Sequence, residues 1–257
     1  MVTRYVTTGR LAINRVTLKP STIVRALATA AVLFVLASAA SQLTKHLVGP
    51  VRGQAVLMLF DADRESNLPT YFSAALLLFA AALLGMIAVL QRRAGAPFGW
   101  GWAVLSLAFL YMSLDEGTSI HETVLERLAR KVLGDPTIGV FYFAWVIPGI
   151  ALVLAFAVVF WRFFFQLPRA TKSRFLLAAA LFLGGALGVE LIGGHHASLH
   201  GIDNLTFSLI ATVEESMEMA GVIMLIYALL KFIELEYGEV RFRFGEPGQS
   251  SGSAYED

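Results

Sequence analysis

The stretch TVEESMEM at residues 212–219 places three carboxylates, Glu214, Glu215 and Glu218, in a segment that is otherwise mostly apolar. The residues that follow it, 220–230, carry no charge at all. Such a run is typical of a helix that spans a lipid bilayer, where an ionisable side chain is costly unless it is paired, protonated, hydrated or bound to a cation. The stretch therefore predicts a membrane-spanning helix, and it predicts that the function of the protein lies beside these acids.

The composition of the whole chain points the same way. Of its 257 residues, 57% are hydrophobic and 15% are charged, whereas soluble domains carry about a quarter charged residues. The formal net charge of +1 gives no indication of a nucleic-acid partner. There is no cysteine, which excludes disulfides, thiolate metal sites and cysteine nucleophiles, and there are five histidines. The composition indicates a polytopic membrane protein in which any metal would need His and carboxylate ligands.

Six segments are apolar enough to cross a bilayer, and each is close to the roughly 20 residues that a hydrocarbon core requires. They are residues 22–44, 70–90, 98–116, 140–163, 174–194 and 205–232. Basic residues, which favour the cytoplasmic side, gather at alternate ends of these segments. They are Arg4, Arg10, Arg15, Lys19, Arg25, Arg92, Arg93, Arg162, Arg169, Lys172, Arg174, Lys231, Arg241 and Arg243. We therefore expect an all-α, polytopic membrane helix bundle of about six transmembrane helices in the cell membrane, with both termini cytoplasmic.

Three regions follow from this topology. Residues 1–21 form a basic cytoplasmic segment, residues 22–233 the transmembrane helical domain, and residues 234–257 a cytoplasmic tail whose Gly-, Ser- and acid-rich end we expect to be disordered. One alternative concerns the first span, because a basic leader, an apolar run and the small residues at 37–39 also describe a cleavable signal peptide. Cleavage would leave five spans and an extracytoplasmic N-terminus.

With both termini cytoplasmic, the unusual polar residues of four separate segments fall at one membrane level, on the extracytoplasmic side. They are Asp61, Asp63, Glu65 and Asn67 before the second span, Asp115, Glu116, His121 and Glu122 at the end of the third, Glu190, His195, His196 and His200 at the end of the fifth, and Asp203, Asn204, Glu214, Glu215 and Glu218 in the sixth. This clustering predicts an acidic pocket that contains histidine at the outer side of the bundle.

Parts of this pattern also have a plain structural interpretation. The alternating oxygen side chains at residues 61–67 are spaced as in a calcium loop, but the Gly and the final Glu that such a loop needs are missing. A solvated loop, with Asn67 or Thr70 capping the second span, is the better interpretation. Glu190 follows a glycine-rich stretch at 184–188, whose small residues let another helix approach closely. A buried acid beside such a seam needs a partner.

Two further spacings leave alternatives open. Asp115 and Glu122 are seven residues apart, so they would share one face and pair if the third helix continued past Gly117. If the helix ends there, the Ser at 119 and Glu122 form a capping box for a following amphipathic helix. His196 and His200 are four residues apart, which suits one metal ion if the segment is helical. Glycines on both sides of these histidines favour a loop instead.

In the sixth span, Glu214 and Glu218 are four residues apart and share one helical face, so they can hold one ion or share one proton. Glu215 belongs to the neighbouring face, where it would meet Glu190 or the region of Asp115. The alternative is that the outer half of this helix stands in water above the membrane. The apolar residues before the acids argue against that alternative.

The first functional hypothesis is a divalent metal site that serves a membrane-embedded hydrolytic or oxidative reaction on a small-molecule or lipid-like substrate. Its candidate ligands are Asp115, His121, Glu122, Glu190, His196, Glu214, Glu215 and Glu218. Carboxylates favour Mn, Fe, Mg or Ca, and imidazole adds Zn. A bound cation would offset the mutual repulsion of the acids, which makes this hypothesis the narrow favourite. The sequence identifies no catalytic residue and leaves open whether the protein is an enzyme.

The second hypothesis is a proton- or cation-coupled transporter that uses the same carboxylates, since acids inside a membrane commonly mark such pathways. Against it, the single chain shows no inverted repeat and the acids lie off the midplane, although a homodimer would supply the missing symmetry. The third hypothesis is a non-catalytic assembly or sensing subunit, in which the acids pair with His and Arg. In all three the lipid bilayer is the expected partner.

Overall fold

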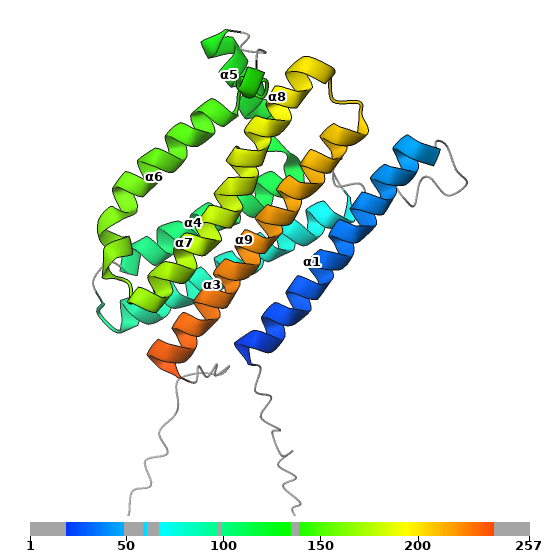
Figure 1. The fold of residues 1–257 in the computed structure, drawn as a ribbon. Helices are drawn as coiled ribbons and strands as arrows, with labels where there is room; N and C mark the ends of the chain where they lie inside the picture. The colour runs from blue at the N-terminus through cyan, green and yellow to red at the C-terminus, as the bar shows by residue number, and fades with distance from the viewer. Residues whose placement is uncertain (1–18, 49–58, 61–66, 97–98, 135–138, 239–257) are drawn as a thin grey trace, which may run out of the picture.

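The computed structural model describes residues 19–48, 59–60, 67–96, 99–134 and 139–238 (Figure 1). Every regular element within these ranges is helical, so the expectation of an all-α protein is confirmed for them. The elements in chain order are α1 (Pro20–Leu43), η1 (Thr44–Val48), α3 (Leu68–Arg93), α4 (Gly99–Thr118), η2 (His121–Leu125), α5 (Glu126–Leu133), η3 (Gly139–Phe141), α6 (Val146–Gln166), α7 (Arg169–Leu183), η4 (Gly184–Val189), α8 (Glu190–His200) and α9 (Leu205–Tyr237). The expectations for residues 61, 63 and 65, for the N-terminal segment before residue 19 and for the tail after residue 238 lie outside the described residues.

Five of the helical stretches are long and apolar enough to cross a membrane. They are Pro20–Val48, Leu68–Arg93, Val146–Gln166, Arg169–His200 and Leu205–Tyr237. The third predicted span corresponds to α4, which falls short of this standard because it combines four Gly and Trp residues at its start with Asp115 and Glu116 near its end. The chain is therefore a helical protein with several membrane-compatible helices, and the described ends at α1 and α9 lie at the same end of the bundle (Figure 1).

The stretch with the paired histidines is helical, so the expected loop is wrong. The helix runs on from α7 through the π turn η4 into α8, and it ends only at Gly201, which has a φ of 74°. Gly193 and Gly194 are buried, and a Cβ on Gly194 would lie 3.1 Å from the carbonyl oxygen of Val140. Gly194 therefore serves the close approach of η3 to α8 rather than a chain reversal, and Gly193 packs at ordinary contact distance against Phe207 and Ile210 of α9.

The helix α9 occupies the centre of the bundle, where it packs against α1, α3 and α7 (Figure 1). Its 33 residues span about 50 Å, which exceeds the roughly 30 Å of a hydrocarbon core. Asn204 caps its start, since the side-chain oxygen accepts a hydrogen bond from the backbone N–H of Phe207 at 2.9 Å. Asn67 caps α3 in the same way, as predicted, with Thr70 N–H as the donor at 2.8 Å.

Small residues bring α7 and η4 close to α9, which agrees with the predicted seam. A Cβ on Gly221 would lie 2.6 Å from the backbone nitrogen of Phe182, and one on Gly185 would lie 2.9 Å from the carbonyl oxygen of Glu214. Gly188, one turn further on, has no atom within 4 Å of its ideal Cβ position. The seam therefore ends before Glu190, and it places the start of α8 beside the acids of α9.

Candidate functional site

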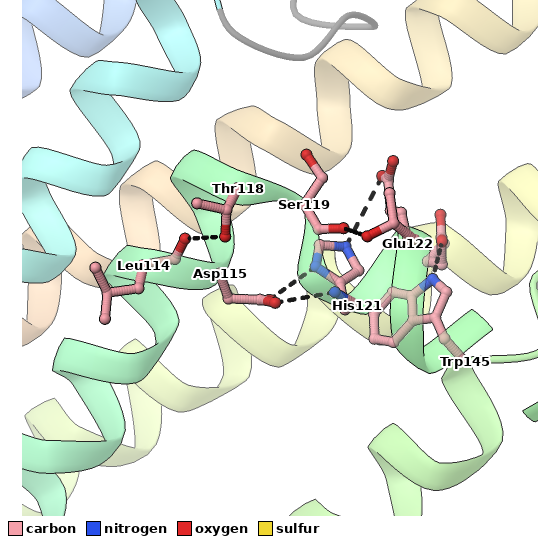
Figure 2. Close-up of polar contacts among 9 residues, drawn as sticks. Leu114, Asp115, Thr118, Ser119, His121, Glu122 and Trp145 are labelled. Carbon is pink, nitrogen blue, oxygen red and sulfur yellow. Dashed lines mark hydrogen bonds and ion pairs between the residues drawn. The ribbon is translucent and has the colours of Figure 1, made fainter. Parts of the chain in front are cut away.

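The end of α4 is shaped by a reversal at Ser119, whose φ of 52° stops the helix. The chain then enters the π turn η2, and this turn folds His121 back onto Asp115 (Figure 2). The backbone N–H of His121 donates to Asp115 Oδ1 at 2.9 Å, and its ring Nδ1 lies 2.8 Å from Asp115 Oδ2. Asp115 thus holds both the backbone and the ring of His121.

This arrangement corrects two expectations. The helix does not continue past Gly117, so Asp115 and Glu122 do not share a helical face, and Asp115 pairs with His121 instead. The capping box is also wrong, because η2 begins after Ile120 with no side-chain cap. Glu122 is exposed, and its Oε1 lies 3.8 Å from His121 Nε2.

The environment of His121 favours its protonated form. Burial alone would lower the pKa of His121, but the hydrogen bond and charge of Asp115, with the charges of Glu122 and Glu116, outweigh burial and raise the pKa above its usual 6.5. Because the folded-state pKa exceeds the unfolded one, the pair stabilises the fold fully below about pH 6.5. That contribution is lost as the pH rises through the folded-state pKa.

We expect Asp115→Asn to lower the pKa of His121 and to destabilise the fold more at acidic than at alkaline pH. The amide keeps the size of the side chain but removes the charge that outweighs burial. NMR titration of the labelled histidine rings measures the shift, with His121→Gln to assign the signal. Glu122→Gln is the matched control, since its carboxylate is exposed and 3.8 Å away. A larger shift in the control than in Asp115→Asn would contradict this account.

Trp145 contacts both His121 and Glu190, and Figure 2 shows its ring beside that of His121. Its ring meets the His121 ring edge-on at 4.7 Å between centroids, and its indole Nε1–H donates to Glu190 Oε1 at 2.9 Å. Its backbone N–H donates to Glu126 Oε2 at 2.8 Å, and Glu126 also binds Arg130 Nε at 2.5 Å. The ion pair on α5 therefore fixes the start of α6 and with it the indole.

Sequence reasoning missed Trp145 and Glu126. A tryptophan at the outer end of an apolar helix is normally interpreted as an interfacial anchor, so its residue type indicated a different role. Glu126 lies among charged residues between two predicted spans, a position typical of a solvated loop. The signal that was present is the spacing of Glu126 and Arg130, four residues apart, which predicts an ion pair on a helix but not its contact with residue 145.

Five glutamates from three helices interact with one another, and we call them the acid cluster. They are Glu116 of α4, Glu190 of α8, and Glu214, Glu215 and Glu218 of α9. The side chains of Glu190 and Glu214 lie close enough to act on each other as hydrogen-bond partners when one of them is protonated. Glu214 and Glu218 are each close enough to Glu190 and Glu215 to interact electrostatically with them, and Glu218 also interacts with Glu116. The structure thus brings most of the acids named from the sequence into one place.

The proximity of Glu190 and Glu214 has a chemical consequence. An ionised carboxylate can only accept hydrogen bonds, so two carboxyl groups can share one only if a proton lies on one of them. Like charges this close also disfavour ionisation of both. The Trp145 indole occupies Oε1 of Glu190, so the other carboxyl oxygen of Glu190 is the one left to meet Glu214.

The remaining predicted ligand, His196, has other partners. Its Nε2 lies 2.8 Å from Asn204 Oδ1, and its ring is 4.9 Å from the ring of His200. Both contacts belong to the turn between α8 and α9. Within the described ranges, no group of three or more His, Asp or Glu side chains is arranged to hold a metal ion. The divalent metal site therefore stays a prediction.

Comparison with known proteins places the chain in a family. No curated protein and no solved structure matches it. A family model described as "Domain of unknown function (DUF8692)" matches residues 18–232. This range includes the membrane-compatible helices up to the last turns of α9, the Asp115–His121 pair and the acid cluster. Because this match covers well over half of the 257 residues, the chain belongs to the DUF8692 family.

Proposed function

We propose that the protein transports protons across the cell membrane, coupled to a second solute when one is present, and that the proton binds and is released at the acid cluster. In this proposal α4 is the sixth crossing helix and both termini are cytoplasmic. The proximity of Glu190 and Glu214 supports the proposal, because two carboxyl groups this close favour a proton shared between them. Intramembrane carboxylates commonly serve as the coupling groups of transporters.

The depth of the acids supports a coupling role. Glu218 lies three residues from Gly221, the midpoint of the 33-residue helix α9, which corresponds to about 5 Å along the helix axis. Glu214 lies one turn further out. The apolar residues 220–230 then separate the cluster from the end of the bundle that holds the described termini. In this proposal Glu218, close to the middle of α9, takes the coupling position that transporters place near the middle of the membrane.

The Asp115–His121 pair gives the cluster a proton donor at its outer side. His121 is a half-buried imidazole whose charge acts on Glu190 through space, and the Trp145 ring lies against it. An indole N–H donates but cannot accept, so Trp145 does not relay a proton; it orients Glu190. A proton would pass from His121 to Glu190 by way of water or a small movement of the imidazole.

The metal-dependent reaction remains the alternative, because the charges that act on Glu218 come from other acids, namely Glu215, Glu116 and Glu190. A divalent cation would offset that repulsion as a proton does. Elemental analysis of purified wild-type protein and Glu214→Gln separates the two ideas. One ion per chain that disappears in the variant would favour the metal site over proton coupling.

We expect proteoliposomes of the wild-type protein to take up protons under an imposed membrane potential, and Glu214→Gln to reduce the uptake to the level of protein-free liposomes. A potassium gradient with valinomycin sets the potential, and an enclosed pH-sensitive dye reports the flux. Glu236→Gln, an exposed glutamate near the end of the same helix, is the control and should behave as wild type. Wild-type flux no greater than that of empty liposomes would overturn the proposal.

A further inference from the structure

A cavity of about 670 Å³ lies between α1 on one side and α7 with α9 on the other. Its wall is almost entirely apolar, and along α1 it extends from Ser21 to Leu36, a distance of about 22 Å. Val32 and Leu36, which line it, are 56% and 61% exposed, so the cavity opens at the surface of the bundle. Its length and its direction along the helices suit an extended hydrocarbon chain that enters from the bilayer.

One end of this cavity is cationic. Arg25 lines it directly, and the Nε–H of this arginine donates to the carbonyl oxygen of Ser21 at 3.1 Å. The Arg174 guanidinium lies over the ring of Tyr227, another lining residue, with its Cζ 5.7 Å from the ring centroid. Arg174 Nη1 is enclosed and has no hydrogen-bond partner in the part of the chain that the structure describes. A buried donor of this kind needs an acceptor.

The rest of the wall adds no acid. The lining includes Arg25 and no carboxylate among the described residues. Guanidinium groups bind phosphate with charge-assisted hydrogen bonds. The combination of an apolar channel with a cationic mouth is complementary to an amphiphile that has an acyl chain and an anionic head.

Other occupants fit less well. The first 18 residues of the chain carry basic side chains and no acid, so the cationic mouth would repel them. The acidic tail beyond residue 245 has the charge but not the apolar side chains that this wall requires. A second copy of the chain would present an apolar helix face without an anion for Arg174.

We infer that this cavity binds one acyl chain of an anionic phospholipid and that Arg25 and Arg174 hold its phosphate. The lipid would lie along α1, with the head at the end of the bundle where α1 begins and α9 ends. This site is separate from the acid cluster and does not depend on proton coupling. It explains why α1 stands off from α7 while it packs on α9 (Figure 1).

The test is native mass spectrometry of the full chain in detergent, with phosphatidylglycerol and phosphatidylcholine that carry identical acyl chains. We expect the wild-type protein to bind phosphatidylglycerol more tightly, and Arg25→Gln and Arg174→Gln each to weaken it about tenfold, the factor that corresponds to one charge-assisted hydrogen bond. Ala220→Phe, which fills the cavity from an exposed position, should reduce the binding of both lipids. Inorganic phosphate should not displace the lipid.

Arg162→Gln is the matched control, because it removes one exposed guanidinium from α6 without touching the cavity. Equal binding of the two lipids would overturn the inference, as would an equal loss in Arg162→Gln or wild-type lipid binding by Ala220→Phe. A change from dimer to monomer in Ala220→Phe with unchanged lipid binding would show that a second copy covers the cavity. Far-UV circular dichroism on each variant confirms that the helices are intact.

Discussion

Gly221→Ala should destabilise the bundle by about 2 kcal/mol, the cost of forcing an extra carbon into a packed interface. The new Cβ would lie 2.6 Å from the backbone nitrogen of Phe182 and 2.8 Å from its Cα. Because these atoms belong to the helix backbone, no rotamer change can relieve the contact, and α7 must move away from α9. That movement would also separate Glu190 from Glu214, since α8, which carries Glu190, continues from α7 through η4.

Gly188→Ala is the control for this experiment. It adds the same methyl group to the same α7–η4–α8 rod at a position with no atom within 4 Å, where alanine has the higher helix propensity. Thermal unfolding in detergent, followed by circular dichroism, measures both variants. We expect a melting temperature several degrees lower for Gly221→Ala and no loss for Gly188→Ala. Equal stability of the two variants would mean that α7 and α9 do not approach as closely as described.

The apolar spans were predictable because hydrophobicity is a local property of the sequence. The last span, expected at 205–232, is the helix Leu205–Tyr237, and the glycines before Glu190 do form a seam with α9. The helical state of the residues after the fifth predicted span, which carry the paired histidines, was harder to predict, because glycine in a sequence usually indicates a break in a helix. At Gly194 the need for close packing against Val140 outweighs that intrinsic preference.

The internal geometry of the site was not predictable from spacing alone. The contact between Asp115 and His121 depends on one positive φ, at Ser119, a residue type that seldom adopts it. Helical periodicity, applied across that break, pairs the wrong residues. The contact between Trp145 and Glu190 joins residues 45 positions apart, and the packing of η3 and the residues after it against α8 creates it. Sequence patterns indicated which acids lie at one level but not which of them share a proton.

Glu214→Gln should remove the shared proton while it keeps the fold. The glutamine amide has nearly the same shape as a protonated carboxyl group, and its N–H can donate to Glu190 where the acid proton did. The contact between α8 and α9 therefore persists, but neither the proton nor its exchange remains. For this reason we expect the variant to unfold close to the wild-type temperature and to lose proton uptake entirely.

The most direct test of the account is infrared spectroscopy of the purified protein at neutral pH, which separates protonated from ionised carboxyl groups by their C=O stretching bands. We expect wild-type protein to show a protonated-carboxyl band that shifts in D₂O. Glu214→Gln should lose the component that belongs to the Glu190–Glu214 pair, and Glu236→Gln should retain it. A wild-type spectrum without a protonated-carboxyl band at neutral pH, or an unchanged band in Glu214→Gln, would contradict the claim that this pair holds a proton.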